Sequence, residues 1–283
     1  MGTLPELDIL FANGRNLAAT WWHPMRMFSE SPDFWRDRLT ASVIHLGVSL
    51  CVATLAALLV FGIWYPYPYR EISGGRELFL LVVAVDVVLG PLITLAVFNR
   101  TKPRSELRRD LGLVGVLQIA ALAYGIWTVA MARPVHMVFE IDRFRVVHAV
   151  DVAPELLPNT PTDIKALPWS GPTLLGTRGF KDNNEMMQVT MAALQGLDIG
   201  ARPDFWQPYE KSVPDVLKAA KPVTLLKLRF APQAADIDGV LAAAGYSDQN
   251  TAYLPMIGRK SFWTVFLDAK TGKVVATMPL DSF

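Results

Sequence analysis

One acidic side chain, Asp86, stands inside the long apolar stretch 78–98. An ionised carboxylate at the centre of a membrane helix raises the free energy of insertion by roughly 2.5 to 3.5 kcal/mol, so such a group is expected to be protonated or to have a polar partner. Gly90 and Pro91 follow one turn later. Glycine allows close helix approach, and proline removes one backbone hydrogen bond. This Asp-x-x-x-Gly-Pro block is therefore the first candidate for a binding site.

Polar side chains in two further apolar stretches fall at similar depths. Counted at about 1.5 Å per residue, Asp86 lies about 12 Å below the nearer end of its helix. We expect the polar residues of all three stretches to form one seam, whose candidate members are Asp86, Gly90, Pro91, Thr94, His45, Ser49, Gln118 and Tyr124. The seam either holds the three helices together, at about 0.6 to 2 kcal/mol per hydrogen bond, or forms a docking groove for another transmembrane helix with its own polar group.

The common catalytic signatures are absent from the sequence. It contains no Gly-rich loop that ends in Gly-Lys-Ser/Thr, no His-Glu-x-x-His and no Gly-x-Ser-x-Gly. With Cys51 as the single cysteine, an intrachain disulfide and a cysteine-based zinc site are excluded. Glu140 and Asp142 could be paired carboxylates, but the solvated face of a strand explains them more simply. The sequence favours a protein that is not an enzyme and has no cofactor and no metal.

Three apolar stretches must position the seam, residues 39–65, 78–98 and 111–132. Each exceeds the length of about 20 residues that a helix needs to span a hydrocarbon core. With 52% hydrophobic residues and a mean hydropathy of +0.28 over 283 residues, the composition is that of a membrane protein. The predicted fold class is a three-helix transmembrane bundle followed by a mixed α/β periplasmic domain.

The positions of lysine and arginine predict the orientation. The connection 99–110 is rich in both, whereas the connection 66–77 balances its arginines with glutamates. We therefore expect a multi-pass protein of a bacterial inner membrane, with a cytoplasmic N-terminus and a periplasmic domain formed by residues 133–283. An aromatic belt at the outer interface would consist of Trp64, Tyr65, Tyr67 and Tyr69.

Residues 1–38 are expected to form a cytoplasmic or interfacial segment, unless translation starts at Met25 or Met27. The net charge of +1 and the lack of a basic stripe exclude a nucleic-acid partner, because phosphate neutralisation needs clustered basic side chains. Membrane lipids are the surroundings that this composition predicts.

The domain 133–283 is expected to begin with strand structure over 135–152. Even spacing would then place Glu140, Asp142 and His148 on one face.

Further elements follow from caps and turns. Expected helices cover 182–194, with Asp182 or Asn183 as cap, 212–220 and 233–244, and an expected hairpin joins 262–268 to 273–278. Methionines recur at helical spacing in the first of these helices, and we interpret them as core packing rather than as a copper site.

The motifs of the first half resemble the TfpX/TfpZ family of type IV pilin accessory proteins, which are related to FimB-type pilus proteins. The resemblance covers about residues 39–152. It rests on segments 44–50, 64–66, 85–95 and 118–125, and on the join around 132–144.

The resemblance implies an inner-membrane protein that helps a particular pilin accumulate or assemble, without enzymatic activity. Its implied partners are the major subunit of a type IV pilus and the pilus assembly machinery. The seam around Asp86 would then shelter the pilin's transmembrane helix in a chaperone-like manner. Two alternatives stay open: a membrane-anchored enzyme that modifies the envelope with a catalytic periplasmic domain, and a membrane protein that senses a ligand.

Overall fold

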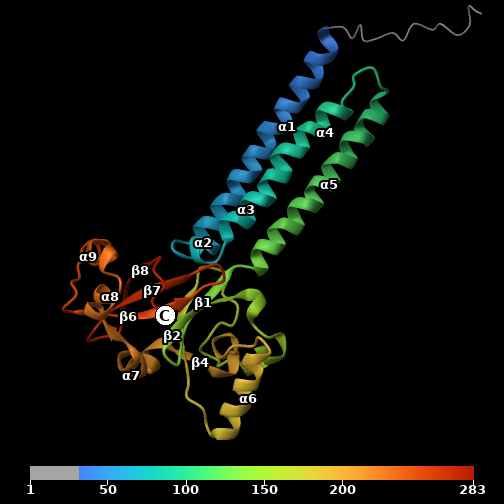
Figure 1. Cartoon of the computed structure of the whole chain (residues 1–283). Coiled ribbons are helices and arrows are strands. Elements are labelled where there is room, and N and C mark those ends of the chain that lie inside the picture. Colours follow the sequence, from blue (N-terminus) through green and yellow to red (C-terminus); the bar gives the residue numbers. More distant parts are fainter. Residues whose placement is uncertain (1–31) are drawn as a thin grey trace, which may run out of the picture.

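The computed structural model describes residues 32–283. The expected N-terminal segment, residues 1–38, lies outside the described residues as far as residue 31. Three long apolar helices lead into a mixed sheet domain at one of their ends (Figure 1). The helical stretches Asp33–Trp64, Gly75–Val97 and Arg104–Met131 are long and apolar enough to cross a membrane.

The helical region contains two π turns. Helix α1 (Pro32–Leu59) continues into η1 (Val60–Trp64), the short α2 is Tyr69–Ile72, the second long helix runs through α3 (Gly75–Ala84), η2 (Val85–Leu89) and α4 (Gly90–Val97), and α5 is Arg104–Met131. Because Pro91 has no N–H to donate, the regular bonding pattern is interrupted one turn earlier, where η2 lies. Asp86 is therefore part of a widened turn.

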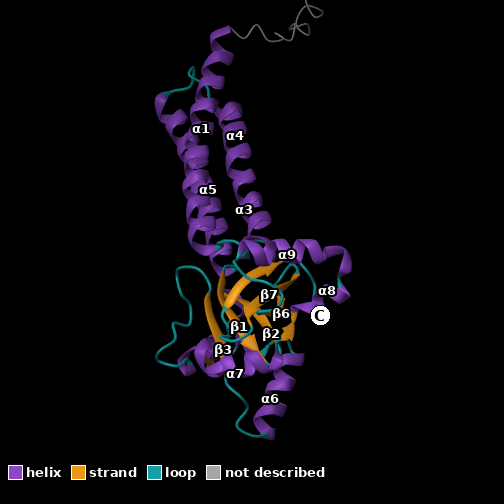
Figure 2. Cartoon of the chain, turned by 90° about the vertical axis from the view of Figure 1, so that its left-hand side faces the viewer, coloured by secondary structure: helices purple, strands orange, loops and turns teal. Residues whose placement is uncertain are grey.

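The sheet domain is built on one mixed sheet of eight strands, which Figure 2 shows at the end of the long helices. The strand order is β4-β3-β1-β2-β6-β7-β8, with β5 also paired to β6. The strands are β1 Pro134–Glu140, β2 Arg143–His148, β3 Thr173–Thr177, β4 Trp206–Pro208, β5 Lys221–Pro222, β6 Thr251–Ile257, β7 Phe262–Asp268 and β8 Val274–Met278. The helices are α6 Asn183–Leu194, α7 Tyr209–Ala219, α8 Val223–Arg229 and α9 Ala234–Ala243.

The two faces of the sheet are covered by different elements. Leu254 and Val265 pack on one face with Val216 of α7, and Ile72 of α2 belongs to the same buried cluster. On the other face, α8 and α9 bury their apolar side chains against β6 and β7. Since successive strand residues point to opposite faces, both faces need a cover. One of these covers, α2, comes from the helical region.

The hairpin and the caps of the sheet domain are confirmed. Strands β7 and β8 pair antiparallel, and the turn between them contains Gly272 with a positive φ of 67°. The Asp182 side chain caps α6 by accepting a hydrogen bond from the Glu185 N–H at 2.8 Å. Helix α9 ends just before Gly245, whose φ is 78°. The expectation for 212–220 is met by α7.

The expectation for residues 135–152 is wrong in one respect, because the segment is a hairpin and not a single strand. Ile141 turns the chain with a φ of 55°. Glu140 is buried and accepts a hydrogen bond from Arg145 at 2.7 Å, whereas Asp142 is exposed in the turn. His148 is buried and contacts Asp151. These three side chains therefore do not share a solvated face.

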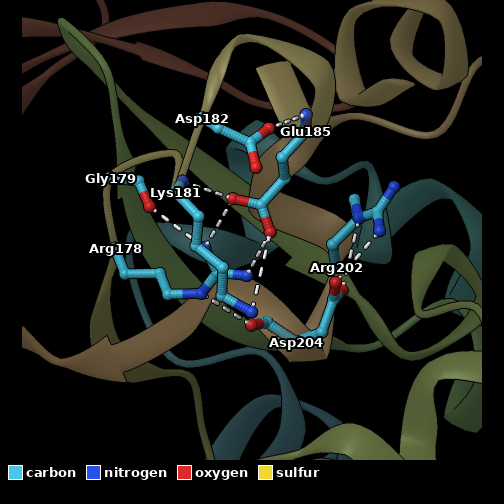
Figure 3. A network of polar contacts seen from close by, with 7 residues as sticks. All are labelled: Arg178, Gly179, Lys181, Asp182, Glu185, Arg202 and Asp204. Carbon is cyan, nitrogen blue, oxygen red and sulfur yellow. Dashed lines mark hydrogen bonds and ion pairs between the residues drawn. The ribbon is translucent and has the colours of Figure 1, made fainter. Parts of the chain in front are cut away.

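The methionines of α6 are exposed, so the core interpretation is wrong. Met186, Met187 and Met191 face solvent, and Val189 is the buried residue of this helix. A polar network fixes the start of α6 instead (Figure 3). Arg178 donates two hydrogen bonds to the Glu185 carboxylate, at 2.9 and 3.0 Å. The helix is thus held by its charged first turn and not by its apolar side chains.

The helices and the sheet domain are locked together at their junction. Lys260 in the β6–β7 loop donates its backbone N–H to the Ile72 carbonyl at 3.0 Å, and its side chain pairs with Glu77 at the start of α3. The expected aromatic belt is corrected here, because Trp64 and Tyr65 are buried in this junction. The bulk of the sheet domain covers them, which hydropathy alone does not predict.

Candidate functional site

A groove of about 560 Å³ runs between α1 and α5, and the second long helix forms its floor. Helix α1 contributes Asp37, Thr40, Ala41, Ile44, His45, Val48, Ser49 and Val52. The floor contributes Asp86, Thr94 and Phe98, the following connection Arg100, and α5 Leu111, Val114, Gly115, Gln118, Ile119 and Leu122. Five of the eight predicted seam residues line this groove: His45, Ser49, Asp86, Thr94 and Gln118.

Close helix approach brings the polar residues of the groove together. His45 Nδ1 lies 2.6 Å from Thr94 Oγ1, which joins α1 to α4. A Cβ at Gly90 would collide with the Gln118 amide and would come within 3.1 Å of His45 Nε2. Glycine is therefore required for the three helices to meet at this level.

The neighbouring proline is also used. The Pro91 carbonyl accepts a hydrogen bond from the Ser42 hydroxyl at 2.9 Å. Both Gly90 and Pro91 are buried between α1 and α5. The Gly-Pro pair thus forms the contact surface of the floor helix, directly below Asp86 in the chain.

Asp86 differs from the other polar residues of the groove. It is half-buried and lines the groove. Within residues 32–283, its carboxylate has no hydrogen bond and no ion pair. Carboxylates in apolar surroundings are unfavourable unless a polar partner is present. The groove therefore presents an acidic group that the described chain does not satisfy.

Tyr124 is not part of this group. Its side chain is 69% exposed on α5, and its ring lies beside Trp127 at 5.9 Å between centroids. Equal depth placed it in the predicted seam, but depth does not determine which way a side chain points around the helix axis.

Sequence reasoning missed an ion pair at the mouth of the groove. Arg100 lies 3.3 Å from Asp37, which connects the start of α1 to the connection after α4. Asp37 lies before the apolar stretch and Arg100 was one of several basic residues, so no spacing signal links them. This pair marks the end of the groove that lies far from the sheet domain.

The other half of the helical region is closed. Val60, Trp64, Phe79 and Val129 form a buried cluster near the sheet domain. A Cβ at Gly125 would lie 2.5 Å from Val82 Cγ1, so α3 and α5 are in direct contact there. The open groove is thus confined to the half away from the sheet.

A second cavity, of about 370 Å³, lies in the sheet domain at the end of β2. It is the type of pocket with ionisable groups that the enzyme alternative predicts. Its acids are paired, because Asp151 contacts Arg259 at 2.9 Å and Asp198 contacts Arg145 at 3.0 Å. No serine, threonine or cysteine of residues 32–283 lines it. The pocket therefore shows no nucleophile next to a base.

Beside this cavity, burial raises the pKa of Glu140, although Arg145 and the Gly200 N–H oppose the shift. Both are hydrogen-bonded to Glu140, at 2.7 and 2.8 Å. This carboxyl group joins β1, β2 and the segment after α6, which is a structural role. In the described part of the chain, no cluster of three or more metal-ligating side chains occurs.

Comparisons with known proteins give one consistent group. The profile of the fimbrial assembly protein FimB family matches residues 33–74. The fimbrial assembly protein of serogroup I from Dichelobacter nodosus is 36% identical over 245 residues, which cover 86% of this chain and 95% of that protein. Its serogroup E1 counterpart is 35% identical over the same shares of the two chains. The protein of serogroups C1 and C2 is 41% identical over 117 residues, 41% of this chain and 89% of its own length. No solved structure gives a significant match.

Proposed function

Because this chain belongs to the FimB family of fimbrial assembly proteins, we propose that it assists fimbrial assembly by holding the transmembrane helix of a cognate type IV pilin in the groove between α1 and α5. The relatives' names support the role in fimbrial assembly, and the likeness extends over both the helices and the sheet domain. In this proposal the protein acts by binding and catalyses no reaction.

The proposed setting is a bacterial inner membrane. The three apolar helices would cross it, with the basic connection after α4 on the cytoplasmic side and residues 133–283 in the periplasm. This arrangement would put the sheet domain on the side where a pilin's globular head lies. The major pilin is the proposed partner, and contact with other parts of the assembly machinery would follow from it.

The single observation that carries the proposal is the unsatisfied Asp86 in an open intramembrane groove. A pilin awaiting assembly is a single-span helix with a glutamate and a charged amino terminus near one end, which are unfavourable in lipid. A donor group on that helix would pair with Asp86, and both polar groups would leave contact with lipid. The apolar walls of α1 and α5 would contact the rest of the helix.

The first experiment replaces the acid. We expect Asp86→Asn and Asp86→Leu to lower the pilin level and the amount of pilin that co-purifies, while the accessory protein itself stays at its normal level. Tyr124→Phe is the matched control, because it removes a polar group from the same helices outside the groove. Unchanged pilin recovery in both Asp86 variants would contradict docking. Loss of the accessory protein itself would show that Asp86 holds the helices together.

A second experiment locates the occupant. A photo-crosslinking residue at Val48, which lines the groove, is expected to capture the pilin in whole cells. The same residue at Val116, which is exposed on α5 outside the groove, is the control. Equal capture at both positions would rule out a specific fit in the groove.

A further inference from the structure

The segment Leu167–Gly171 leaves the sheet domain and returns to the ends of the long helices. Just before it, Ala166 packs against a buried cluster of the domain, and its carbonyl lies 2.9 Å from His136 Nε2. Just after it, strand β3 begins at Thr173. The segment is thus a short excursion between two fixed points.

Two contacts pin this segment to the helix ends. The Gly171 N–H donates to the Ile63 carbonyl at 2.8 Å, and Ile63 belongs to the first membrane-length helix. On the other side, Arg133 directs one nitrogen toward the Pro168 carbonyl at 3.4 Å and donates from another to the Ala130 carbonyl of α5 at 2.6 Å. The segment therefore lies at the level of the last turns of α1 and α5.

Trp169 projects from the segment with 59% of its surface exposed. One edge of it contacts the buried Trp64, at 5.4 Å between ring centroids, and the Arg133 guanidinium lies 5.8 Å from its ring centre. Leu167 is exposed beside it. An exposed tryptophan and leucine are unfavourable in water, and here they lie where an apolar helix ends.

Two more exposed aromatic side chains lie near the same level. Tyr67 follows η1 in the chain, and Trp127 lies one turn before the end of α5. Tryptophan and tyrosine are enriched where a membrane meets water, because their rings are apolar and their N–H or O–H groups find polar partners there. The belt predicted from residues 64–69 thus has other members, one of which comes from the sheet domain.

We propose that Leu167–Gly171 is a membrane-interface segment that places the Trp169 ring between lipid headgroups and acyl chains. The partner is the lipid surface itself, and the sheet domain rests on it through a part of its own chain. The inference depends on the long helices spanning a membrane and not on pilin docking. The groove lies in the opposite half of the helices, so a docked helix there leaves Trp169 facing lipid.

Spin labels on the full chain test this in vesicles of phosphatidylethanolamine and phosphatidylglycerol. With Cys51 replaced by serine, single cysteines are placed at Ser170 in the segment, Leu117 on the exposed side of α5, and Leu194 at the end of α6. Ser170→Cys keeps Trp169, and Leu167→Cys serves as a second variant in the same segment. The measured quantity is the collision rate of the label with oxygen relative to a water-soluble nickel chelate.

The ratio at 170 and 167 is expected to lie well above the value at 194, which faces water, and below the value at 117, which faces lipid. A ratio at both segment positions equal to that at 194 would overturn the proposal, because the segment would then be in water. Low collision rates with both reagents would overturn it as well, since a protein and not lipid would cover the segment. Pilin docking is tested by other positions, so the two proposals fail independently.

Discussion

Near the sheet domain, Val60, Phe79 and Val129 of three different helices are almost completely buried, whereas in the other half α1 and α5 stand apart on either side of α4. The same three helices thus form a tight contact at one end and an open groove at the other. The closed half is continuous with the sheet domain through Ile72. The comparison indicates that the closed half fixes the helices, so that the open half can accept a partner.

The largest expected effect comes from breaking the closed half. Trp64 is 1% exposed, and removing a buried aromatic side chain costs about 3 to 5 kcal/mol. We expect Trp64→Ala to reduce the unfolding temperature and the cellular level strongly. Tyr124→Ala, at an exposed position of the same region, should change the free energy of unfolding by less than about 0.5 kcal/mol. Similar effects of the two variants would remove the distinction between the halves.

The domain on which the closed half stands should lose stability in mild acid. Burial lowers the pKa of His136 to about 4, from about 6.5 in the unfolded chain. The unfolded state binds the proton first, so this contribution is full above pH 6.5 and is lost as the pH falls toward 4. The loss reaches about 3 kcal/mol. Chemical denaturation across this pH range measures it, and His136→Gln should flatten the dependence.

A pair of glycine variants sharpens the comparison. Gly125→Ala forces a methyl group against the branched Val82, and such overpacking costs about 1 to 3 kcal/mol. Gly90→Ala meets the flexible end of Gln118, which has the groove to move into. We expect the first variant to lower thermal stability, and the second to lower pilin co-purification with little loss of stability. The reverse pattern would contradict the assignment of the two halves.

The smallest effect concerns the far end of the sheet domain. The hydrogen bonds from Arg178 lower the pKa of Glu185 to about 2. The pairing is therefore complete above the ordinary carboxyl pKa of about 4.3 and is lost as the pH falls toward 2. Hydrogen exchange should show the first turn of α6 opening in that range, and Glu185→Gln should abolish the pH dependence. Unchanged exchange rates would mean that the pair does not hold the helix.

Much of the helical region could be predicted because an apolar run of sufficient length leaves few alternatives. Depth along the helix brought Asp86, His45 and Gln118 into one group. The facing direction of Tyr124 could not be predicted this way, since successive residues rotate by about 100° around a helix. The burial of Trp64 needed the sheet domain as a cover, and the position of Trp169 in a proline-rich loop has no periodicity that would reveal it.

The π turn at Val85–Leu89 has a consequence for the phase of the second long helix. Such a turn holds one more residue than an α-turn, so deleting one residue within it would let a regular α-helix form. The two parts of the helix would then rotate against each other by about 100°. Either Asp86 or the Gly90–Thr94 surface would leave the groove. An insertion of a single residue is thus what allows the acid and the helix-contact surface to face the same side.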